Sequence, residues 1–313
     1  MKNSYKIINT GINSPDIAIA MLAYNHENYI GQAIESVLMQ KTSYNYKIII
    51  AEDYSTDNTR KIVLEYQKKY PDKVKLILQD KNVGANLNNI NLLSNLEGKY
   101  VAALEGDDYW TDPLKLQKQV DFLEANLDYV LCFHRVNILK INGEIVDDFI
   151  TKVPENHEAI ETLARLGNYI HTPSVVFRNV LKEFPFEFEH SPIGDYFLYM
   201  MLAEQGKLKY LDEKMGVYRY GVGGFSGNSR LTMAKTNLKL FTCLLSYLKD
   251  DEIKKIIFDR QIYAVAHLEK ILHEEYDSYF VSNHIFFRAV KSTQTYLTKP
   301  SKILKKIILK FKK

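Results

Sequence analysis

The sequence predicts an α/β protein built around a mostly parallel sheet with helices on both faces. Apolar runs of strand length alternate with segments whose apolar residues recur at helical spacing, which is the pattern of repeated strand–helix units. Three of those runs end in polar clusters, and parallel strands bring such ends to one edge of the sheet, where α/β proteins bind ligands. The chain has 313 residues, 46% of them hydrophobic, so it can bury one large core and carry an appendage.

The first four expected strands are continuous apolar runs, which suit strands covered on both faces. They lie at 17–23, 46–51, 74–78 and 100–104. Apolar residues three or four positions apart indicate helices at 30–38, around 62–66, at 87–96 and at 114–126. The crossovers that join the parallel strands are expected to be right-handed.

Beyond residue 126 the expected elements are shorter. Strands are predicted at 129–141, 171–178, 208–211 and 216–220, with Asn142-Gly143 as a hairpin turn. Helices are predicted at 158–166 and 197–205, and then in the C-terminal part at 238–248, 253–272 and 282–296. The glycine-rich loop at 221–227 either folds over a ligand or simply connects to these last helices.

An acidic cluster, Glu105-Gly106-Asp107-Asp108-Tyr109-Trp110, follows the fourth strand and precedes a helix-start signal. Three carboxylates within four residues repel one another, and a divalent cation would offset that repulsion. Mg²⁺ and Mn²⁺ prefer carboxylate oxygens and often share their coordination shell with substrate phosphates. The alternative is a solvated acidic turn that caps the next helix, which accounts for Asp112 as the N-cap but not for Asp107 and Asp108.

The basic character of the chain is concentrated at its C-terminal end. The formal net charge is +3, and residues 299–313 hold seven lysines and no acid, so the rest of the chain is net acidic. A nucleic-acid-binding face over the whole domain is therefore not expected. Within the tail, five apolar residues share one helical face with lysines beside it, namely Ile303, Leu304, Ile307, Ile308 and Phe311. This pattern predicts contact with an anionic membrane surface, and a disordered basic tail is the alternative.

The compartment expected from the sequence is the cytoplasm. We find no apolar run of about 18 residues that would span a membrane and no secretory signal at the start of the sequence. Cys132 and Cys243 are far apart and lack metal-type spacing, so reduced, buried thiols are the simplest interpretation.

The order of four motifs resembles family 2 glycosyltransferases. The motifs are Ala23-Tyr24-Asn25 with Ser36-Val37-Leu38-Met39-Gln40, then Glu52-Asp53-Tyr54-Ser55-Thr56-Asp57, then Asn82-Val83-Gly84, and finally the acidic cluster. The resemblance implies the GT-A fold and an inverting, nucleotide-sugar-dependent enzyme. It implies a glycosyltransferase domain at 1–225, with a nucleotide-sugar-binding half at 15–125 and an acceptor-binding half at 126–225, followed by a helical region at 226–313. Tyr54 departs from the family pattern, which has glycine at that place.

The resemblance also assigns roles on the nucleotide side. Tyr24 would pack against the base, and Asp53 would accept the imide N–H of a uracil; a core tyrosine and an N-cap aspartate are the alternatives. Ala23, Asn25, Glu27, Asn82 and Gly84 would complete the nucleotide-sugar site. Asp108 would ligate a divalent metal, Mn²⁺ or Mg²⁺, and Asp107 would contact the ribose or the metal, which would bridge the diphosphate.

On the acceptor side, Asp195 matches the family's catalytic base at the start of a helix, although an N-cap aspartate would explain it equally well. Trp110, the single tryptophan, is either a platform for a sugar ring or a wedge against the next helix. His171 and Arg219 either contact the diphosphate or acceptor, or are a satisfied loop histidine and a salt-bridged strand residue.

The function expected from the sequence is metal-dependent hexosyl or N-acetylhexosaminyl transfer. A UDP-sugar would serve as donor, a saccharide or lipid-linked molecule of surface polysaccharide synthesis as acceptor, and the enzyme would lie peripherally at the inner face of the cell membrane. A sugar nucleotidyltransferase is less consistent with the sequence, because the glycine-rich basic loop after the first strand is missing. A non-catalytic binding module would not need Asp53, Asp107, Asp108 and Asp195 together. The donor sugar, acceptor, linkage and oligomeric state stay open.

Overall fold

The structure, a computed structural model, describes residues 4–9, 14–222 and 229–276. In these residues one sheet of ten strands runs through the molecule, in the order β1-β4-β3-β2-β5-β9-β7-β10-β6, with β8 paired to β7. Four strands form its parallel part: β2 (Ile17–Ala23), β3 (Tyr46–Glu52), β4 (Val74–Gln79) and β5 (Tyr100–Glu105). Ala23 lies opposite Glu52 and Leu22 opposite Glu105, so these strands end at one edge, as the sequence predicts.

The rest of the sheet is mixed. Its strands are β9 (Val176–Arg178), β7 (Tyr129–Leu139), β10 (Lys207–Arg219), β6 (Tyr109–Trp110) and β8 (Ile145–Asp147). β9 is antiparallel to both β5 and β7, whereas β10 runs parallel to β7 and antiparallel to β6. The two-residue strand β6 therefore brings the end of the acidic cluster beside β10. At the opposite edge, β1 (Tyr5–Ile8) pairs antiparallel with β4, and the sequence analysis did not predict it because only four partly exposed residues form it.

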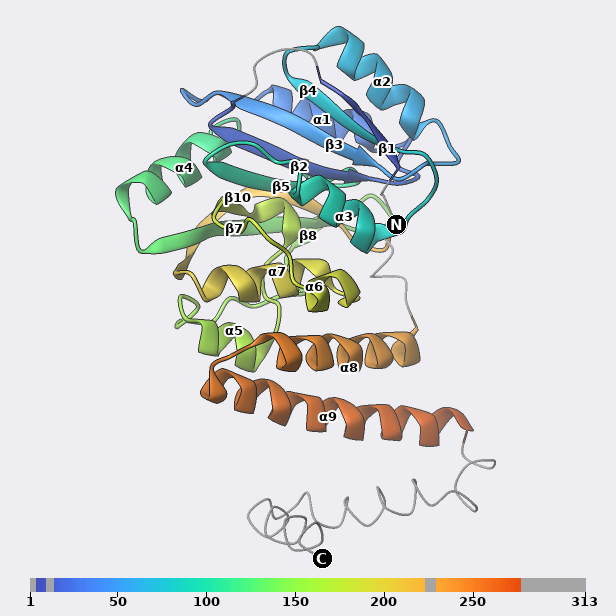
Figure 1. Cartoon of the computed structure of the whole chain (residues 1–313), viewed down its shortest axis with the longest axis vertical. Coiled ribbons are helices and arrows are strands. Elements are labelled where there is room, and N and C mark those ends of the chain that lie inside the picture. The colour runs from blue at the N-terminus through green and yellow to red at the C-terminus, as the bar shows by residue number, and fades with distance from the viewer. Residues whose placement is uncertain (1–3, 10–13, 223–228, 277–313) are drawn as a thin grey trace, which may run out of the picture.

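Helices cover both faces of the sheet (Figure 1). On one face, α1 (Ile30–Leu38), α2 (Thr59–Lys69) and α4 (Lys115–Ala125) bury their apolar sides against the strands. On the other face lie α3 (Ala85–Leu93), α5 (Ile160–Leu166), α6 (Phe186–His190) and α7 (Gly194–Ala203). The two hydrophobic clusters are separated by the sheet, because successive strand residues point to opposite faces.

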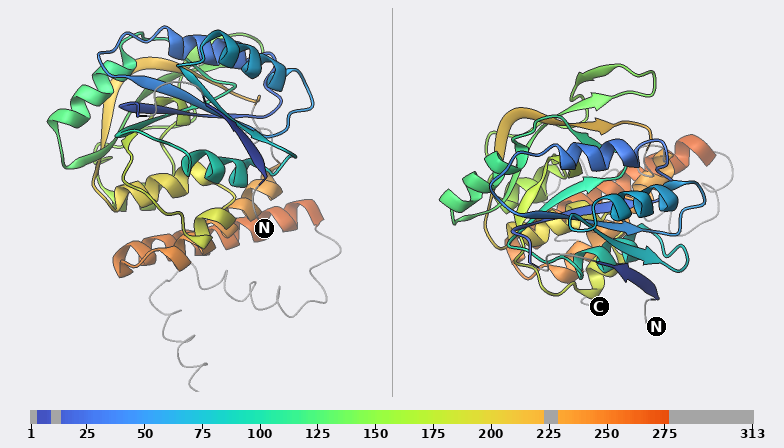
Figure 2. Two further views of the ribbon diagram at one scale, coloured as in Figure 1. Left: turned by 45° about the horizontal axis from the view of Figure 1, so that its top comes forward. Right: turned by 90° about the horizontal axis from the view of Figure 1, so that it is seen from above.

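A hairpin of two long helices, α8 (Arg230–Tyr247) and α9 (Asp251–Tyr276), forms an outer layer beyond α5, α6 and α7 (Figures 1 and 2). Leu240, Phe241 and Leu244 of α8 and Ile257 of α9 join the core on that side. Among the described residues no helix is both long and apolar enough to cross a membrane. The helix predicted at 282–296 and the tail 299–313 lie outside the described residues, as does most of the glycine-rich loop.

Several predicted boundaries shift. The two short strands expected at 208–211 and 216–220 form one strand, β10, whose register against β7 slips between Leu211 and Lys214; the irregularity there made the sequence pattern look like two strands. The segment expected to begin a strand at His171 contains a 3₁₀ turn, Thr172–Ser174, and the strand itself starts at Val176. The helix expected at 197–205 already begins at Gly194. The hairpin turn at Asn142-Gly143 is confirmed, and Gly143 has a φ of 85°.

Candidate active site

Three carboxylates gather at the end of β5. Oxygen atoms of Glu105, Asp107 and Asp108 all lie within 4.8 Å of one another. Asp107 and Asp108 are 4% and 1% exposed, and Oδ1 of Asp107 and Oδ2 of Asp108 are buried with no hydrogen-bond partner among the described residues. Buried carboxylate oxygens normally accept hydrogen bonds or ligate a cation. The three residues therefore fit a divalent metal such as Mg²⁺ or Mn²⁺.

The electrostatics of the cluster agree with this fit. Burial, together with the negative charges of Asp107 and Asp195, raises the pKa of Glu105 to about 8. Burial and the neighbouring Asp107 and Glu105 also raise the pKa of Asp108 well above its usual range. A bound cation would act against both effects, because it favours the ionised carboxylates.

Arg219 fastens the acidic cluster to β10. Its backbone N–H donates to Oδ1 of Asp108 at 2.8 Å. Its guanidinium donates to the carbonyl oxygen of Asp107 and to Gln32 Oε1, and lies 4.8 Å from the ring centres of Tyr29 and Tyr109. The side chain is thus engaged by protein groups, and a contact with the diphosphate remains a prediction.

Gly106 and His26 were not among the predicted site residues, yet both shape the cluster. A Cβ on Gly106 would come within 2.7 Å of His26 Nδ1 and of Ile30 Cδ1, so a larger residue there would displace those side chains. Nε2 of His26 lies 3.9 Å from Oδ2 of Asp107, and burial lowers the pKa of the imidazole. The available signal was the position of His26, directly after the polar end of the first parallel strand.

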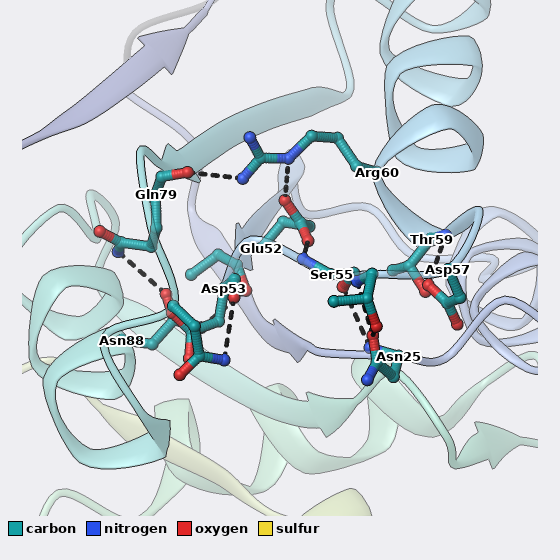
Figure 3. A network of polar contacts seen from close by, with 12 residues as sticks. Asn25, Glu52, Asp53, Ser55, Asp57, Thr59, Arg60, Gln79 and Asn88 are labelled. Atoms are coloured by element: carbon teal, nitrogen blue, oxygen red, sulfur yellow. Dashed lines mark hydrogen bonds and ion pairs between the residues drawn. The ribbon is translucent and has the colours of Figure 1, made fainter.

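The loops after β2 and β3 interlock through side-chain hydrogen bonds (Figure 3). Oδ1 of Asn25 accepts from the backbone N–H of Thr56 at 2.9 Å, and the N–H of Asn25 donates to Ser55 Oγ at 3.0 Å. Glu27 Oε2 accepts from the N–H of Asn58 at 3.0 Å. Asn25 and Tyr54 have φ values of 53° and 57°, which are left-handed and unusual for non-glycine residues. Tyr54 thus adopts the backbone that the family's glycine favours.

Asp53 ties the end of β3 to the loop after β4. Its Oδ1 accepts from the N–H of Val83 at 2.7 Å and its Oδ2 from the N–H of Gly84 at 2.9 Å, while Asn82 Nδ2 donates to its carbonyl oxygen. Burial raises the pKa of Asp53. The N-cap alternative is wrong, because Asn58 takes that position in α2. The N–H of Asp53 in turn donates to the carbonyl oxygen of Ala23 at 3.0 Å.

Tyr24 is 42% exposed at the same edge of the sheet, so it is not the core tyrosine of the alternative interpretation. Trp110, by contrast, is 1% exposed, and its indole N–H donates to the carbonyl oxygen of Pro173 at 2.8 Å. The Nζ of Lys115 lies 4.1 Å from the Trp110 ring centre. A ring buried in this way has no free face for a sugar, so the platform interpretation is wrong and Trp110 belongs to the hydrophobic core.

Asp195 lies in the first turn of α7, where its Oδ1 accepts from the N–H of Tyr196 at 2.7 Å. Asn168 Nδ2 donates to its Oδ2 at 2.9 Å. Burial raises the pKa of the Asp195 carboxyl. The residue is not the N-cap, which is Ile193, and sequence reasoning missed Asn168.

A cavity of about 650 Å³ joins the acidic cluster to Asp195. Glu105, Asp107 and Asp195 all line it. His171 lines it too, with Nε2 2.9 Å from Oδ2 of Asp148, so it is a partnered loop histidine at the cavity wall. Asp53 and Asp108 are not lining residues, but Ala85 is, which directly follows the Gly84 that Asp53 holds.

The fold and the acidic cluster together define a glycosyltransferase of the GT-A type. A family model described as Glycosyl transferase family 2 matches residues 18–184, which is more than half of the chain. The protein therefore belongs to this family, and the resemblance seen in its motifs is confirmed.

Individual relatives agree with the family. An uncharacterised Mycobacterium tuberculosis protein, Rv1520, is 36% identical over 203 residues, which cover 65% of this chain and 58% of the relative. The chain thus spans a little over half of that relative's length. The Escherichia coli enzyme WfgD, named UDP-Glc:alpha-D-GlcNAc-diphosphoundecaprenol beta-1,3-glucosyltransferase, is 29% identical over 197 residues, 63% of this chain and 73% of the relative.

Two solved structures share the fold. The mannosyltransferase PcManGT from Pyrobaculum calidifontis, in complex with GDP-Man and Mn²⁺, aligns with a TM-score of 0.59 at 16% identity, covering 96% of this chain and 85% of that one. Residues 1–349 of TarS from S. aureus, in complex with UDP, align with a TM-score of 0.53 at 18% identity, covering 86% and 73%. At these identities the likeness concerns the fold alone.

Proposed function

We propose that this glycosyltransferase transfers one sugar, with inversion, from a UDP-sugar to a saccharide or lipid-linked acceptor of surface polysaccharide synthesis. The observation that carries the proposal is the single cavity that Glu105, Asp107 and Asp195 share at the carboxyl edge of the sheet. The relatives add support: WfgD is named for a UDP-Glc donor and a diphosphoundecaprenol-linked acceptor, and TarS was solved with UDP.

Residues of the first half, 15–125, would bind the donor. Tyr24 is exposed directly after β2 and would stack on the base. Asp53 would accept the uracil imide N–H with the lone pairs that Val83 and Gly84 leave free, since each carboxylate oxygen has two. Ala23 at the end of β2, Asn25 and Glu27 in the loop after it, and Asn82 in the loop after β4 would enclose the nucleotide.

A divalent cation, Mn²⁺ or Mg²⁺, would be held by Asp108 and Asp107, with Glu105 close by. When bound, it would neutralise charge on the diphosphate and so assist departure of the nucleotide. The two buried carboxylate oxygens without partners support this role, and PcManGT was solved with Mn²⁺. Hexosyl or N-acetylhexosaminyl transfer would suit the same arrangement.

Asp195 would accept the proton of the attacking hydroxyl. Inversion is a single in-line displacement, so the base and the leaving nucleotide lie on opposite sides of the transferred carbon, and a neutral hydroxyl needs a base. Asp195 lines the same cavity as Glu105 and Asp107 and belongs to the half 126–225 that would bind the acceptor. Asn168 orients its carboxylate.

The helical part, 226–313, would place the enzyme at the cytoplasmic face of the membrane through residues 299–313, whose lysines would attract anionic lipid. Co-sedimentation with anionic liposomes tests this location. The full chain should pellet, and a chain that ends at residue 298 should stay in the supernatant; equal binding of both would remove the proposal.

Incubation with a panel of UDP-sugars and Mn²⁺ tests the reaction itself. A transferase moves the sugar to an acceptor or, slowly, to water and releases UDP. A nucleotidyltransferase releases pyrophosphate only from UTP and a sugar 1-phosphate, which are supplied in a parallel incubation. Release of pyrophosphate, or of neither product with every sugar, would contradict the proposed function.

A further inference from the structure

The shared cavity continues well past the carboxylates. From Asp195 it runs along the sheet between α3 and α7 and reaches α8, which Figure 1 shows lying beyond them. Six large apolar side chains are among the residues that line it away from the carboxylates, and we call this part the apolar arm: Leu92, Leu93, Phe177, Leu198, Leu240 and Phe241. The proposed transfer chemistry uses none of them.

The apolar arm has room for a ligand because a small residue, Ala103, lines the cavity from the middle of the sheet. β5 has a paired strand on either side, yet Ala103 on that strand is only half-buried. Leu22 on the neighbouring β2 is also partly exposed. A strand residue in the middle of a covered sheet is reachable only through a cavity, and alanine leaves room where a larger side chain would fill it.

The volume favours a ligand as the occupant. Protein interiors leave few voids larger than a water molecule, whereas ligand pockets measure roughly 300–1,000 Å³. A cavity of about 650 Å³ that opens onto carboxylates falls in the second class. The charged residue at its far end, Arg260, is already engaged, since its guanidinium donates to the carbonyl oxygen of Ala164 and to the hydroxyl of Tyr196.

The chemistry of the wall decides between kinds of ligand. Asn86, Asn89, Thr236 and Asn237 also line the cavity. A saccharide that lay against the six apolar side chains would nevertheless lose water from its hydroxyls without gaining hydrogen bonds from them, which is unfavourable. A hydrocarbon would gain from the same surroundings. Tyr24 and Asp53, which would bind the base, do not line the cavity, so the base does not compete for the apolar arm.

We propose that the acceptor carries a hydrocarbon chain next to the saccharide that receives the sugar, and that this chain lies in the apolar arm. The inference rests on the proposed function, because it takes Asp195 as the group that faces the acceptor hydroxyl. It goes further by naming the part of the acceptor that the enzyme recognises and the residues that do so.

Binding of n-alkyl β-glucosides tests the inference, with methyl, hexyl and octyl chains below their critical micelle concentrations, in the presence of UDP and Mn²⁺. Each buried methylene favours binding, so octyl glucoside should bind at least about 10-fold more tightly than methyl glucoside. Equal affinities of the methyl and octyl compounds for the wild type would overturn the inference.

Two substitutions test whether the hydrocarbon chain lies in the apolar arm. Ala103→Leu should fill the cavity and reduce the advantage of octyl over methyl glucoside to less than about 3-fold, because a leucine occupies space that the chain needs. The matched control is Ala125→Leu at the exposed end of α4, which should leave the advantage unchanged. If Ala103→Leu does not fold, Leu93→Asn makes the same test. Leu93 is a half-buried residue of α3, and a polar side chain there would disfavour a hydrocarbon chain. An undiminished octyl preference in the folded variants would also overturn the inference.

UDP affinity, measured on the same samples, separates the two proposals. UDP binding without any chain-length preference removes only the apolar arm as an acceptor site. A chain-length preference in a protein that binds no UDP-sugar removes the proposed transfer reaction and leaves a hydrocarbon-binding cavity.

Discussion

The backbone N–H of Arg219 donates a hydrogen bond of 2.8 Å to Oδ1 of Asp108, across 111 positions of sequence. It joins the end of β10 to the acidic cluster after β5, and the guanidinium of the same residue binds the carbonyl oxygen of Asp107. The orientation of the candidate metal ligands therefore depends on a strand from the other half of the chain.

Replacement of Arg219 should loosen the acidic cluster. Arg219→Met removes charge-assisted hydrogen bonds from a side chain that is 7% exposed, so the free energy of unfolding should fall by about 2–3 kcal/mol in urea titrations. Arg135→Met is the control, because its surface ion pairs with Asp147 and Asp212 should contribute less than about 1 kcal/mol. Equal losses in the two variants would show that Arg219 does not hold the cluster.

Asp108→Asn should have opposite effects on metal binding and on metal-free stability. The apparent Kd for Mn²⁺ should rise at least about 10-fold, since a carboxylate ligand becomes an amide. The metal-free protein should unfold at a higher temperature, because the neutral amide no longer repels Asp107 and Glu105 in a buried site. Isothermal titration and thermal unfolding measure the two effects. Asp112→Asn, outside the cluster and paired with Lys118, should leave Mn²⁺ affinity unchanged, and the metal role fails if both variants bind Mn²⁺ like the wild type.

Asp195→Asn should abolish transfer while UDP affinity stays within about 2-fold of the wild type. A general base contributes roughly 10²–10⁴-fold, so kcat should fall by at least about 100-fold. The same substitution at Asp251, in the first turn of α9, should leave kcat unchanged, because that position is exposed and distant from the cavity. Near-normal turnover of Asp195→Asn would reject the base.

The Tyr54→Gly variant should be more stable than the Tyr54→Ala variant. Both Tyr54→Gly and Tyr54→Ala lose the ring and its contact with Arg60, so their difference reports the backbone alone. A left-handed residue costs about 1–2 kcal/mol more with a Cβ than without, and Tyr54 has a φ of 57°. Urea unfolding should therefore favour the glycine variant by about 1 kcal/mol. At Tyr24, which lacks a positive φ, the order should reverse; the same order at both positions would contradict the backbone explanation.

Lys115 should make stability depend on pH. Its side chain is fully buried, its Nζ has no hydrogen-bond partner among the described residues, and burial lowers its pKa to about 7. The unfolded chain, with a pKa of about 10.4, binds more protons between pH 7 and pH 10, so the folded state gains up to about 1.4 kcal/mol per pH unit as the pH rises.

Lys115→Met should therefore stabilise the protein most at pH 7, and its advantage should shrink by pH 9 in urea titrations. The control is Lys118→Met on the same helix. The ion pairs of Lys118 with Asp112 and Glu213 raise its pKa, so its effect should stay flat between pH 7 and pH 9. A flat difference for Lys115→Met as well would mean that the buried amine does not titrate in this range.

Local patterns were sufficient for much of the first half of the chain. The four parallel strands and their polar ends could be predicted because each apolar run is covered on both faces and reports its burial directly. The acidic cluster could be predicted as a candidate metal site because repulsion among adjacent carboxylates is a local property. Prediction was weaker after residue 126, where β10 is irregular and β6 has only two residues, since short strands leave little periodicity to detect.

The sequence by itself determined the fold class, the family and the three polar strand ends, because these follow from the order and spacing of residues close together in the chain. Only the tertiary structure decided that Trp110 is buried, that Arg219 holds Asp108, that Asn168 orients Asp195, and that a cavity continues past the carboxylates to α8. Each of these depends on contacts between segments far apart in the chain. Such contacts are set by how strands pair and helices pack, which no local pattern records.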